Sequence, residues 1–412
     1  GAYAATEATL QAAYGTTESA DQIIAASTIA SQVEAITTAI DAVITQKDGT
    51  FFGYSDVYLE GDRVFGRAQE VNLGDISADA NLFRAREALG DSVVLGSLKN
   101  GGGIRASIGS IGESGEKLPP AASPVKPAGA ISQLDIENAL RFDNKLMVFD
   151  TTPGGLLAIL NHAAGLAPGN GGYAQVGGIH FSYDPSLPVG ARVRDVAVHD
   201  LEGRFVARVV DDGVVLPQAP SSLSVVSLNF TANGGDGYPI KANGDNFRYL
   251  LAGGGLSAPV DETLDFTAAA TVPAGALGEQ AAFAAFLETF HGTPETAYAS
   301  ADTPAALDER IQNLQVKAED TVLPASLLSV GGVEIPGGSS LALTFPGNET
   351  TAVALLARIG GGQPGTPAEV LATVPGAASG LPAGFPPGLP SAVLGADGGI
   401  GAVEFLLQDL AT

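Results

Sequence analysis

Apolar residues recur at helical spacing in the first fifty positions of the chain. Residues 5–48 contain no proline, and four of their apolar residues repeat at the spacing of one helix face: Ile36, Ile40, Val43 and Ile44. This pattern predicts one or two helices that lead into a main domain. The helical pattern is expected to stop at Lys47-Asp48-Gly49, where a basic residue in the last turn is followed by glycine.

Beyond residue 50, short apolar runs alternate irregularly with helical patterns. Strands are predicted at residues 51–59, 93–98, 146–150, 179–183, 193–199, 214–216 and 223–228. Helices are predicted at residues 76–89, 134–140 and 155–163, and residues 260–310 are predicted to be mostly helical. Because the two kinds of element alternate without a regular βαβ order, we expect an α+β (mixed α/β) fold.

Proline and glycine divide the chain into parts. Residues 112–129 carry four prolines and are predicted to form an exposed insertion. After residue 314, glycine and proline pairs separate short apolar runs, which is typical of a small β-rich appendage or a partial further domain. We therefore expect a helical linker region over residues 1–48, a main domain over 49–314 and the appendage over 315–412.

Composition and charge exclude several classes of function. The chain of 412 residues contains no cysteine, so disulfides, thiolate catalysis and cysteine metal sites are excluded. It carries 45 acidic and 20 basic residues, and its net charge of −25 opposes binding of a nucleic-acid polymer. No apolar run approaches the roughly 18 residues that span a bilayer. Since the first residues do not resemble a signal peptide, we expect a soluble chain whose export signal was removed or lies upstream.

Two glycine-rich stretches carry the candidate chemistry. They are Asn100–Arg105 and, about 130 residues later, Asn229–Tyr238. Glycine lets the backbone approach a ligand closely. The first stretch adds a guanidinium group suited to phosphate, and the second adds a phenyl ring and a carboxylate suited to a base and a ribose. Together they predict a nucleotide-binding site.

Residues 33–314 resemble the C-terminal substrate-binding domain of the 5′-nucleotidase family, which includes periplasmic UDP-sugar hydrolases and ecto-5′-nucleotidases. Six blocks follow one another in the family's order: Arg63–Arg67, Glu70–Ala80, Asn100–Arg105, Leu140–Asn144, Gly172–Ile179 and Asn229–Tyr238. The segment Glu309-Arg310-Ile311 resembles the end of the family domain. Six blocks in order are far more specific than a single glycine run.

The resemblance implies that three arginines contact the substrate phosphate: Arg63, Arg67 and Arg105. Arg63 and Arg67 are four residues apart, so they face nearly the same way on a strand or a helix. A guanidinium group stays charged and matches phosphate oxygens in a bidentate manner. The alternative for the first two is a surface role in a turn.

The resemblance also implies a base-binding slot. Phe142 and Phe230 match the two family rings between which the base is stacked. Such rings accept any base, because every base has a π face. Asn144 has groups for the base edge, and Asp236 can accept hydrogen bonds from ribose hydroxyls. Asn100 matches a family position near the substrate, although its amide is equally suited to capping a turn.

Two residues depart from the family pattern, and both introduce a carboxylate. Asp143 replaces the usual glycine after Phe142, which places a negative charge beside the expected pocket. Asp75 replaces the usual asparagine in the block that begins at Glu70. The preferred base therefore stays open.

Members of the family hydrolyse phosphate esters in an N-terminal metallophosphatase domain that holds two divalent metals. This chain offers only four widely spaced histidines, for which structural or surface roles are favoured over metal ligation: His162, His180, His199 and His291. The resemblance therefore implies no cofactor in this chain itself. The two metals are expected in an N-terminal domain of the same polypeptide.

We therefore expect the nucleotide-binding C-terminal part of a secreted 5′-nucleotidase-like phosphohydrolase, in an extracellular, periplasmic or cell-surface location. It would capture a nucleotide or nucleoside and carry the phosphate to the metals by domain rotation. One alternative is a 2′,3′-cyclic nucleotide phosphodiesterase or UDP-sugar hydrolase of the same family. The other is a non-catalytic nucleotide-binding surface module.

Overall fold

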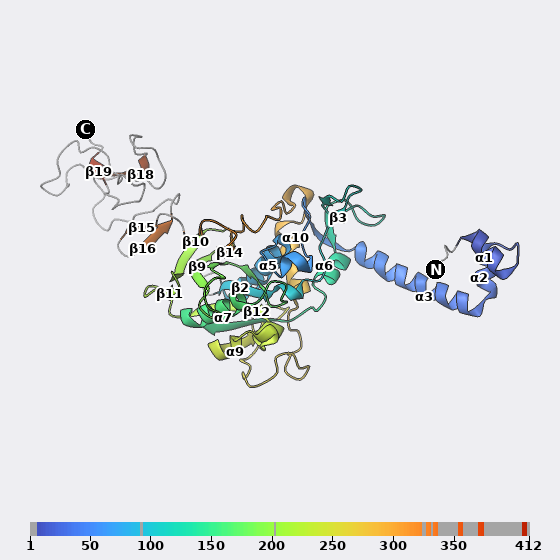
Figure 1. Ribbon diagram of the computed structural model, residues 1–412, viewed down its shortest axis with the longest axis horizontal. Helices are drawn as coiled ribbons and strands as arrows, with labels where there is room; N and C mark the ends of the chain where they lie inside the picture. Colours follow the sequence, from blue (N-terminus) through green and yellow to red (C-terminus); the bar gives the residue numbers. More distant parts are fainter. Residues whose placement is uncertain are drawn as a thin grey trace.

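The computed structural model describes residues 6–90, 94–201 and 203–323, together with the backbone of five later strands. Its centre is built from two five-stranded sheets (Figure 1). The first has the order β13-β6-β12-β2-β7 and consists of Gly244–Tyr249, Leu146–Thr151, Leu223–Leu228, Val94–Asn100 and Ala174–Gly177. The second has the order β11-β10-β9-β8-β14 and consists of Val214–Val215, Phe205–Asp211, Val193–His199, Ile179–Tyr183 and Ile311–Asn313.

The first sheet is mixed, and its register brings the candidate motifs to one end. Strand β12 runs parallel to β2, with Ser227 opposite Leu98, and antiparallel to β6, with Leu228 opposite Leu146. The C-terminal ends of β2 and β12 therefore lie beside the N-terminal end of β6. Asn100, Asn229 and the segment before Leu146 all leave the sheet at this end of the strands, so the motifs are close in space. The mixture of helices with mixed and antiparallel sheets confirms the α+β prediction.

Helices cover the sheets and enclose the apolar core. Helix α7 (Pro153–Gly165) contributes Leu156, Ile159 and Leu160 to a cluster shared with both sheets. Helix α5 (Asn72–Leu89) packs on β2 and β7, and α10 (Glu279–Phe290) packs on α5. Helix α6 (Gln133–Ala139) completes a second cluster with α5 and α10.

Short elements complete the main body. They are α4 (Arg63–Gly66), α8 (Asn229–Ala232), α9 (Ile240–Asn243) and three one-turn 3₁₀ helices, Gly101–Gly103, Gly235–Gly237 and Pro294–Thr296. Strand β1 (Phe51–Tyr54) pairs with β5 (Ala130–Ser132). Strand β3 (Ser110–Ile111), directly before the predicted insertion, forms a small hairpin with β4 (Lys117–Leu118) inside it.

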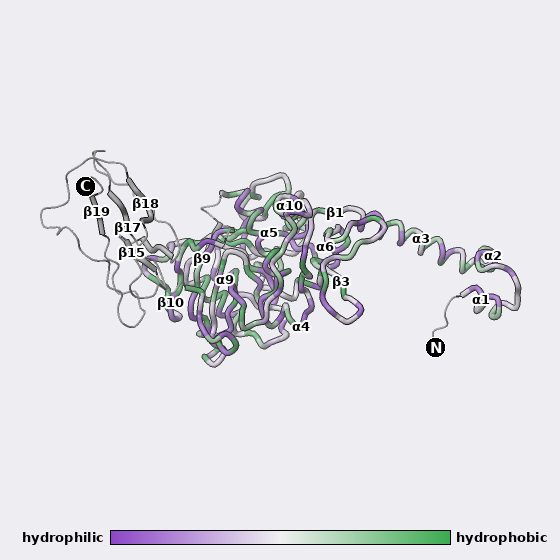
Figure 2. Tube along the Cα trace, turned by 90° about the horizontal axis from the view of Figure 1, so that it is seen from above, coloured by the Kyte–Doolittle hydropathy of each residue, from purple (hydrophilic) through white to green (hydrophobic). Residues whose placement is uncertain are grey.

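Three helices precede the body, where one or two were predicted: α1 (Glu7–Tyr14), α2 (Ala20–Ala26) and α3 (Thr28–Asp48). The serine residues that cap the later helices explain the extra break, since Ser19 caps α2 and Ser27 caps α3. Helix α3 extends away from the body, with α1 and α2 at its far end (Figures 1 and 2). Five apolar residues of α3 are each more than half exposed: Ile29, Val33, Ile36, Ile40 and Val43.

In the described part of the chain, no single helix is long and apolar enough to cross a bilayer. The pair α2 and α3 reaches that length and composition only jointly, across a bend of 110°.

A further expectation about elements is wrong, and several strands were not predicted. Residues 260–310 are not mostly helical, because only α10 and the turn Pro294–Thr296 are helical there. Asp261 and Asp265 accept hydrogen bonds from Thr263 and Thr267, and these local contacts favour turns over helix. Strands β7, β10, β13 and β14 of the two central sheets were not predicted. Strand β13 lacks a clear apolar run, whereas the apolar residues of β10, Phe205, Val206, Val209 and Val210, were overlooked.

After residue 323, strand segments occur in the expected appendage. Strand β15 (Leu327–Val330) pairs with β16 (Val333–Pro336), and β17 (Val353–Leu356) pairs with both β18 (Val370–Val374) and β19 (Leu406–Asp409). The other residues of this part lie outside the described residues. The division of the chain at residues 49 and 315 therefore stays a prediction.

Candidate functional site

Seven of the eight predicted site residues line one cavity of about 350 Å³. They are Arg67, Asn100, Arg105, Phe142, Asn144, Phe230 and Asp236. Gly102, Gly103 and Gly171 complete the lining. The seven side chains span about 170 residues of sequence. They lie close together because their segments meet at the same end of strands β2, β12 and β6. Their role in binding stays a prediction.

Arg63 lies outside this cavity, in an adjoining hollow. That hollow has a similar volume, about 350 Å³, and its lining includes Arg63, Arg105 and Ser107. Arg105 borders both spaces. Arg63 is the first residue of α4 and Arg67 caps its end, so the short helix directs the two side chains into different spaces. Arg105 is therefore the residue that connects the two.

In the described part of the chain, the three arginines form no ion pair with a carboxylate, whereas several other arginines do. Within the described ranges, Arg63, Arg67 and Arg105 form no ion pair, whereas these five do: Arg84, Arg194, Arg204, Arg208 and Arg310. The Nε atom of Arg67 is buried and has no hydrogen-bond partner. Among the described residues, the Arg105 side chain donates one hydrogen bond, to the carbonyl oxygen of Gly102 at 3.3 Å. In a chain with 45 acidic residues, these free guanidinium donors are suited to an anion from outside.

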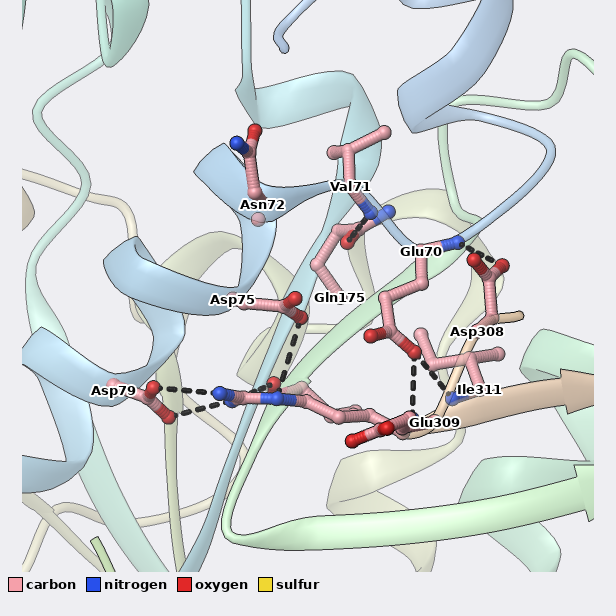
Figure 3. A network of polar contacts seen from close by, with 12 residues as sticks. Glu70, Val71, Asn72, Asp75, Asp79, Gln175, Asp308, Glu309 and Ile311 are labelled. Atoms are coloured by element: carbon pink, nitrogen blue, oxygen red, sulfur yellow. Dashed lines mark hydrogen bonds and ion pairs between the residues drawn. The ribbon is translucent and has the colours of Figure 1, made fainter. Parts of the chain in front are cut away.

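Gln175 on β7 holds the segment that carries Arg67. Its fully buried side chain donates to the carbonyl oxygens of Gly66, at 3.2 Å, and Gln69, at 2.9 Å. It also accepts from the Val71 N–H, a contact drawn in Figure 3. The sequence did not single out Gln175, although it lies within one of the six blocks.

The glycine run at 101–103 joins backbone segments more than it makes room for a ligand. A Cβ atom on Gly101 would lie 1.9 Å from the carbonyl oxygen of Gly66, and one on Gly102 would lie 2.8 Å from that of Gly171. The N–H groups of Gly101 and Gly102 donate to Tyr173 and Gly171. A side chain at either position would separate three segments that line the cavity.

The two rings border the cavity from different elements. Phe142 is 58% exposed and lies 5.5 Å from the guanidinium carbon of Arg105, measured to the ring centroid. Phe230 on α8 is half-buried, and a Cβ atom on Gly235 would lie 2.5 Å from its ring. Ring contacts among the described residues do not include a Phe142–Phe230 pair, so the rings border a shared space without touching.

Asn229 ties the two ring-bearing segments together. Its side-chain oxygen accepts from the Lys145 N–H at 2.9 Å, and its own N–H donates to the Lys145 carbonyl at 2.7 Å. Its Nδ2 donates to the carbonyl oxygen of Phe266 at 2.9 Å. Since Lys145 follows Asn144 and Asn229 precedes Phe230, these bonds determine how far apart the rings lie. Asn229 was not among the predicted site residues, despite its place at the start of a motif.

Asn100 positions Asp236 rather than capping a turn. Its Nδ2 donates to Oδ2 of Asp236 at 2.6 Å, and it makes no capping hydrogen bond to the following 3₁₀ turn. Its Oδ1 atom is buried and has no partner. Asp236 has φ 54°, in the left-handed region, and Nε2 of His162 donates to its carbonyl oxygen at 3.0 Å. His162 therefore supports the site from α7 without lining the cavity.

The carboxylate of Asp143 is turned toward positive and donor groups. Asp143 has φ 45°, the left-handed conformation for which the family uses glycine. Its Oδ2 pairs with Nζ of Lys145 at 2.6 Å, and its Oδ1 accepts from the Gln280 N–H at 3.4 Å. The extra charge beside the cavity is thus balanced by Lys145 and by the start of α10.

A larger cavity, of about 570 Å³, has the wrong charge for a phosphate. Its lining includes Glu70, Asp75, Asp79, Asp302 and Glu309. A half-buried cation crosses this cluster, since Arg310 bonds both oxygens of Asp79, at 2.7 and 2.8 Å, and approaches Asp75 at 3.5 Å. Asp75 and Asp79 are labelled in Figure 3.

This network has a structural role, because it joins the start of α5 to β14. The Glu70 carboxylate accepts from the N–H groups of Arg310, at 2.6 Å, and Ile311, at 2.8 Å. Asp75 lines this larger cavity and lies 3.5 Å from Arg310, so this departure from the family pattern belongs to the network and not to the candidate site. Burial raises the pKa of Asp75 well above its usual value. Across residues 6–90, 94–201 and 203–323, no group of His, Asp or Glu is arranged to hold a metal.

Asp308 makes the stability of this network dependent on pH. It is 2% exposed, and burial together with the Glu70 charge raises its pKa to about 7. The folded chain therefore keeps this proton between about pH 4 and pH 7, where an unfolded carboxyl group releases it. The stabilisation is complete below pH 4 and is lost as the pH rises through 7.

We expect Asp308→Asn, which cannot release a proton, to remove this pH dependence. Relative to the variant, the wild-type chain should lose roughly 2–3 kcal/mol of stability, or about 4–12 °C in melting temperature, between pH 5 and pH 8. Thermal melts at the two pH values measure the difference, with Glu262→Gln as an exposed-carboxylate control. Parallel pH curves for wild type and Asp308→Asn would contradict the assignment.

Comparison with known proteins gives one family and several partial relatives. Residues 52–243 match the family model of the 5′-nucleotidase, C-terminal domain. The chain is 31% identical over 202 residues to the trifunctional nucleotide phosphoesterase protein YfkN of Bacillus subtilis strain 168, covering 48% of this chain and 12% of that protein. It is 29% identical over 181 residues to the 5′-nucleotidase of Vibrio parahaemolyticus serotype O3:K6, covering 44% of this chain and 24% of that enzyme.

Among solved structures, the 5′-nucleotidase precursor from Thermus thermophilus matches with a TM-score of 0.46 and 25% identity. The match covers 68% of this chain and 42% of that one. The matched part of the chain thus spans less than a third of the length of the curated relatives, at 12–30% of each.

Proposed function

We propose, from the premise that residues 52–243 form a 5′-nucleotidase C-terminal domain, that this chain is the nucleotide-binding part of a secreted 5′-nucleotidase-like phosphohydrolase. One observation carries the proposal: seven residues expected to bind a nucleotide line a single cavity of about 350 Å³. That volume lies within the range of about 300–1,000 Å³ for small-molecule sites.

The charges around the cavity favour one orientation of the nucleotide. The base lies between Phe142 and Phe230, with Asn144 at its edge. The ribose hydroxyls face Asp236, because its carboxylate would repel a phosphate but accepts hydrogen bonds from hydroxyl groups. The phosphate then lies at Arg67 and Arg105, and Arg63 extends the positive charge into the adjoining hollow.

Hydrolysis is assigned to a separate N-terminal metallophosphatase domain of the same polypeptide, holding two divalent metals that would activate water and stabilise the phosphoryl oxygens. The described residues of this chain do not fit such a metal pair. Helix α3 supports the presence of another domain. Its exposed apolar residues follow one another at intervals of four, three, four and three, and a lone helix in water is only marginally stable. We propose that the metallophosphatase domain covers this apolar face.

An extracellular, periplasmic or cell-surface location completes the proposal. It is supported by the acidic composition, with a net charge of −25, which suits a protein exposed to salt.

We expect the purified chain to bind AMP and adenosine without turnover. Titration calorimetry should detect both ligands, while a phosphate-release assay with added Mn²⁺, Zn²⁺ or Co²⁺ should show no hydrolysis. The binding groups are present, whereas the metal ligands are expected in the other domain. Absence of binding for both ligands would refute the proposed function, and metal-dependent turnover would refute the separate catalytic domain.

A further inference from the structure

A lysine of strand β2 and a glutamate of helix α10 form a fully buried ion pair. The side chains of Lys99 and Glu279 are both 0% exposed, and Nζ lies 2.9 Å from Oε2. Nζ also donates to Oγ of Ser77 at 3.1 Å, whereas Oε1 of Glu279 has no partner. Two apolar residues of similar volume would stabilise such a position as well or better, so stability alone does not account for the pair.

The pair connects a strand whose end lines the candidate cavity to a helix that lies outside the cavity lining. Lys99 is the residue of β2 directly before Asn100. Glu279 is the first residue of α10. The pair therefore links the end of the cavity formed by Asn100 and the glycine run to the first turn of a helix that does not itself line the cavity.

That first turn holds the segment bearing Phe142. The Glu279 N–H donates to the carbonyl oxygen of Asn144 at 3.0 Å. The Gln280 N–H donates to Asp143, and the Gln280 side chain donates to the carbonyl oxygen of Leu140 at 2.9 Å. These bonds lie on both sides of Phe142, so any shift of the start of α10 moves the ring and Asn144 with it.

We propose that Lys99 and Glu279 are positioning residues that set the distance between the phosphate and ribose end of the site and its base end. This inference rests on the proposed function. Apolar contacts of Phe283 and Leu287 also hold α10, but such contacts are non-directional. A short, charge-assisted hydrogen bond determines where the first turn lies. Neither residue touches the ligand.

The double variant Lys99→Met, Glu279→Met tests the inference without leaving one buried charge unpaired. We expect it to fold with a melting temperature close to that of wild type. Its affinity for AMP, which spans both ends of the site, should fall about tenfold. Ribose 5-phosphate and adenine, which each reach only one end, should bind within twofold of wild type by ligand-observed NMR. A purely structural pair would not distinguish spanning from single-end ligands.

Lys126→Met is the matched control, since Lys126 is 7% exposed, pairs with Asp48 and Asp135, and does not line the cavity. It should lower stability and leave AMP affinity unchanged. AMP affinity of the double variant within twofold of wild type would overturn the inference. Lack of AMP binding by the wild-type chain would instead refute the proposed function.

If the double variant does not fold, Glu279→Gln supplies the test, because it keeps an oxygen for Lys99 but removes the charge. About threefold weaker AMP binding with unchanged ribose 5-phosphate binding would support positioning. Equal changes for AMP, adenine and ribose 5-phosphate would overturn it.

Discussion

Phe142→Ala is expected to weaken the binding of nucleosides and nucleotides alike, by about 1–3 kcal/mol, or on the order of 5- to 150-fold. The ring offers one stacking surface for the base, and alanine removes it. Because Phe142 is 58% exposed, its removal should change the free energy of unfolding little. Calorimetric titration with adenosine and AMP measures both affinities on the same protein.

Phe230→Ala should produce a similar loss from the opposite side of the cavity, with some loss of stability because this ring is half-buried. Phe51→Ala is a suitable control, since Phe51 is 39% exposed and does not line the cavity. Unchanged adenosine affinity in Phe142→Ala would show that the base does not bind between these rings.

Arg105→Ala is expected to separate the two classes of ligand. Nucleotide affinity should fall by about 1.5–3 kcal/mol, the usual contribution of a hydrogen bond to a charged group, which is on the order of 10- to 150-fold. Nucleoside affinity should change little, since a nucleoside has no phosphate. Arg105 is an exposed residue, so the fold should tolerate the loss of its side chain.

Arg141→Ala is the matched control for charge, because Arg141 is an exposed neighbour of Phe142 that does not line the cavity. It should leave the preference for nucleotides intact. Arg63→Ala should give a smaller nucleotide-specific loss, since Arg63 lies in the adjoining hollow. Equal losses of AMP and adenosine binding in Arg105→Ala would contradict a phosphate role.

The spacing of apolar residues predicted much of the fold, but it did not predict strands that depend on pairing with a distant segment. Apolar runs located β6, β8, β9 and β12, because a buried strand needs only its own side chains to show that pattern. In contrast, β13 contains Asp245, Asn246 and Arg248, and it forms by pairing with β6. Tertiary pairing therefore decided its conformation.

The candidate site shows the same division. Residue types and motif order were enough to nominate eight positions, and seven of them share a cavity. Sequence could not show that Arg63 would enter a different space, because that depends on the direction in which α4 places its side chain. It also could not show that the carboxylate of Asp143 turns toward Lys145 and α10.

The sequence by itself determined the absence of thiol chemistry, the acidic charge, the mixed class of fold and the residues suited to a nucleotide. These follow from residue identity and short-range spacing, which are local properties. Only the tertiary structure decided the contacts that organise the site: Asn100 with Asp236, Lys145 with Asn229, and Lys99 with Glu279. Their partners are 136, 84 and 180 residues apart, and such contacts exist only once the sheet order and helix packing bring distant segments together.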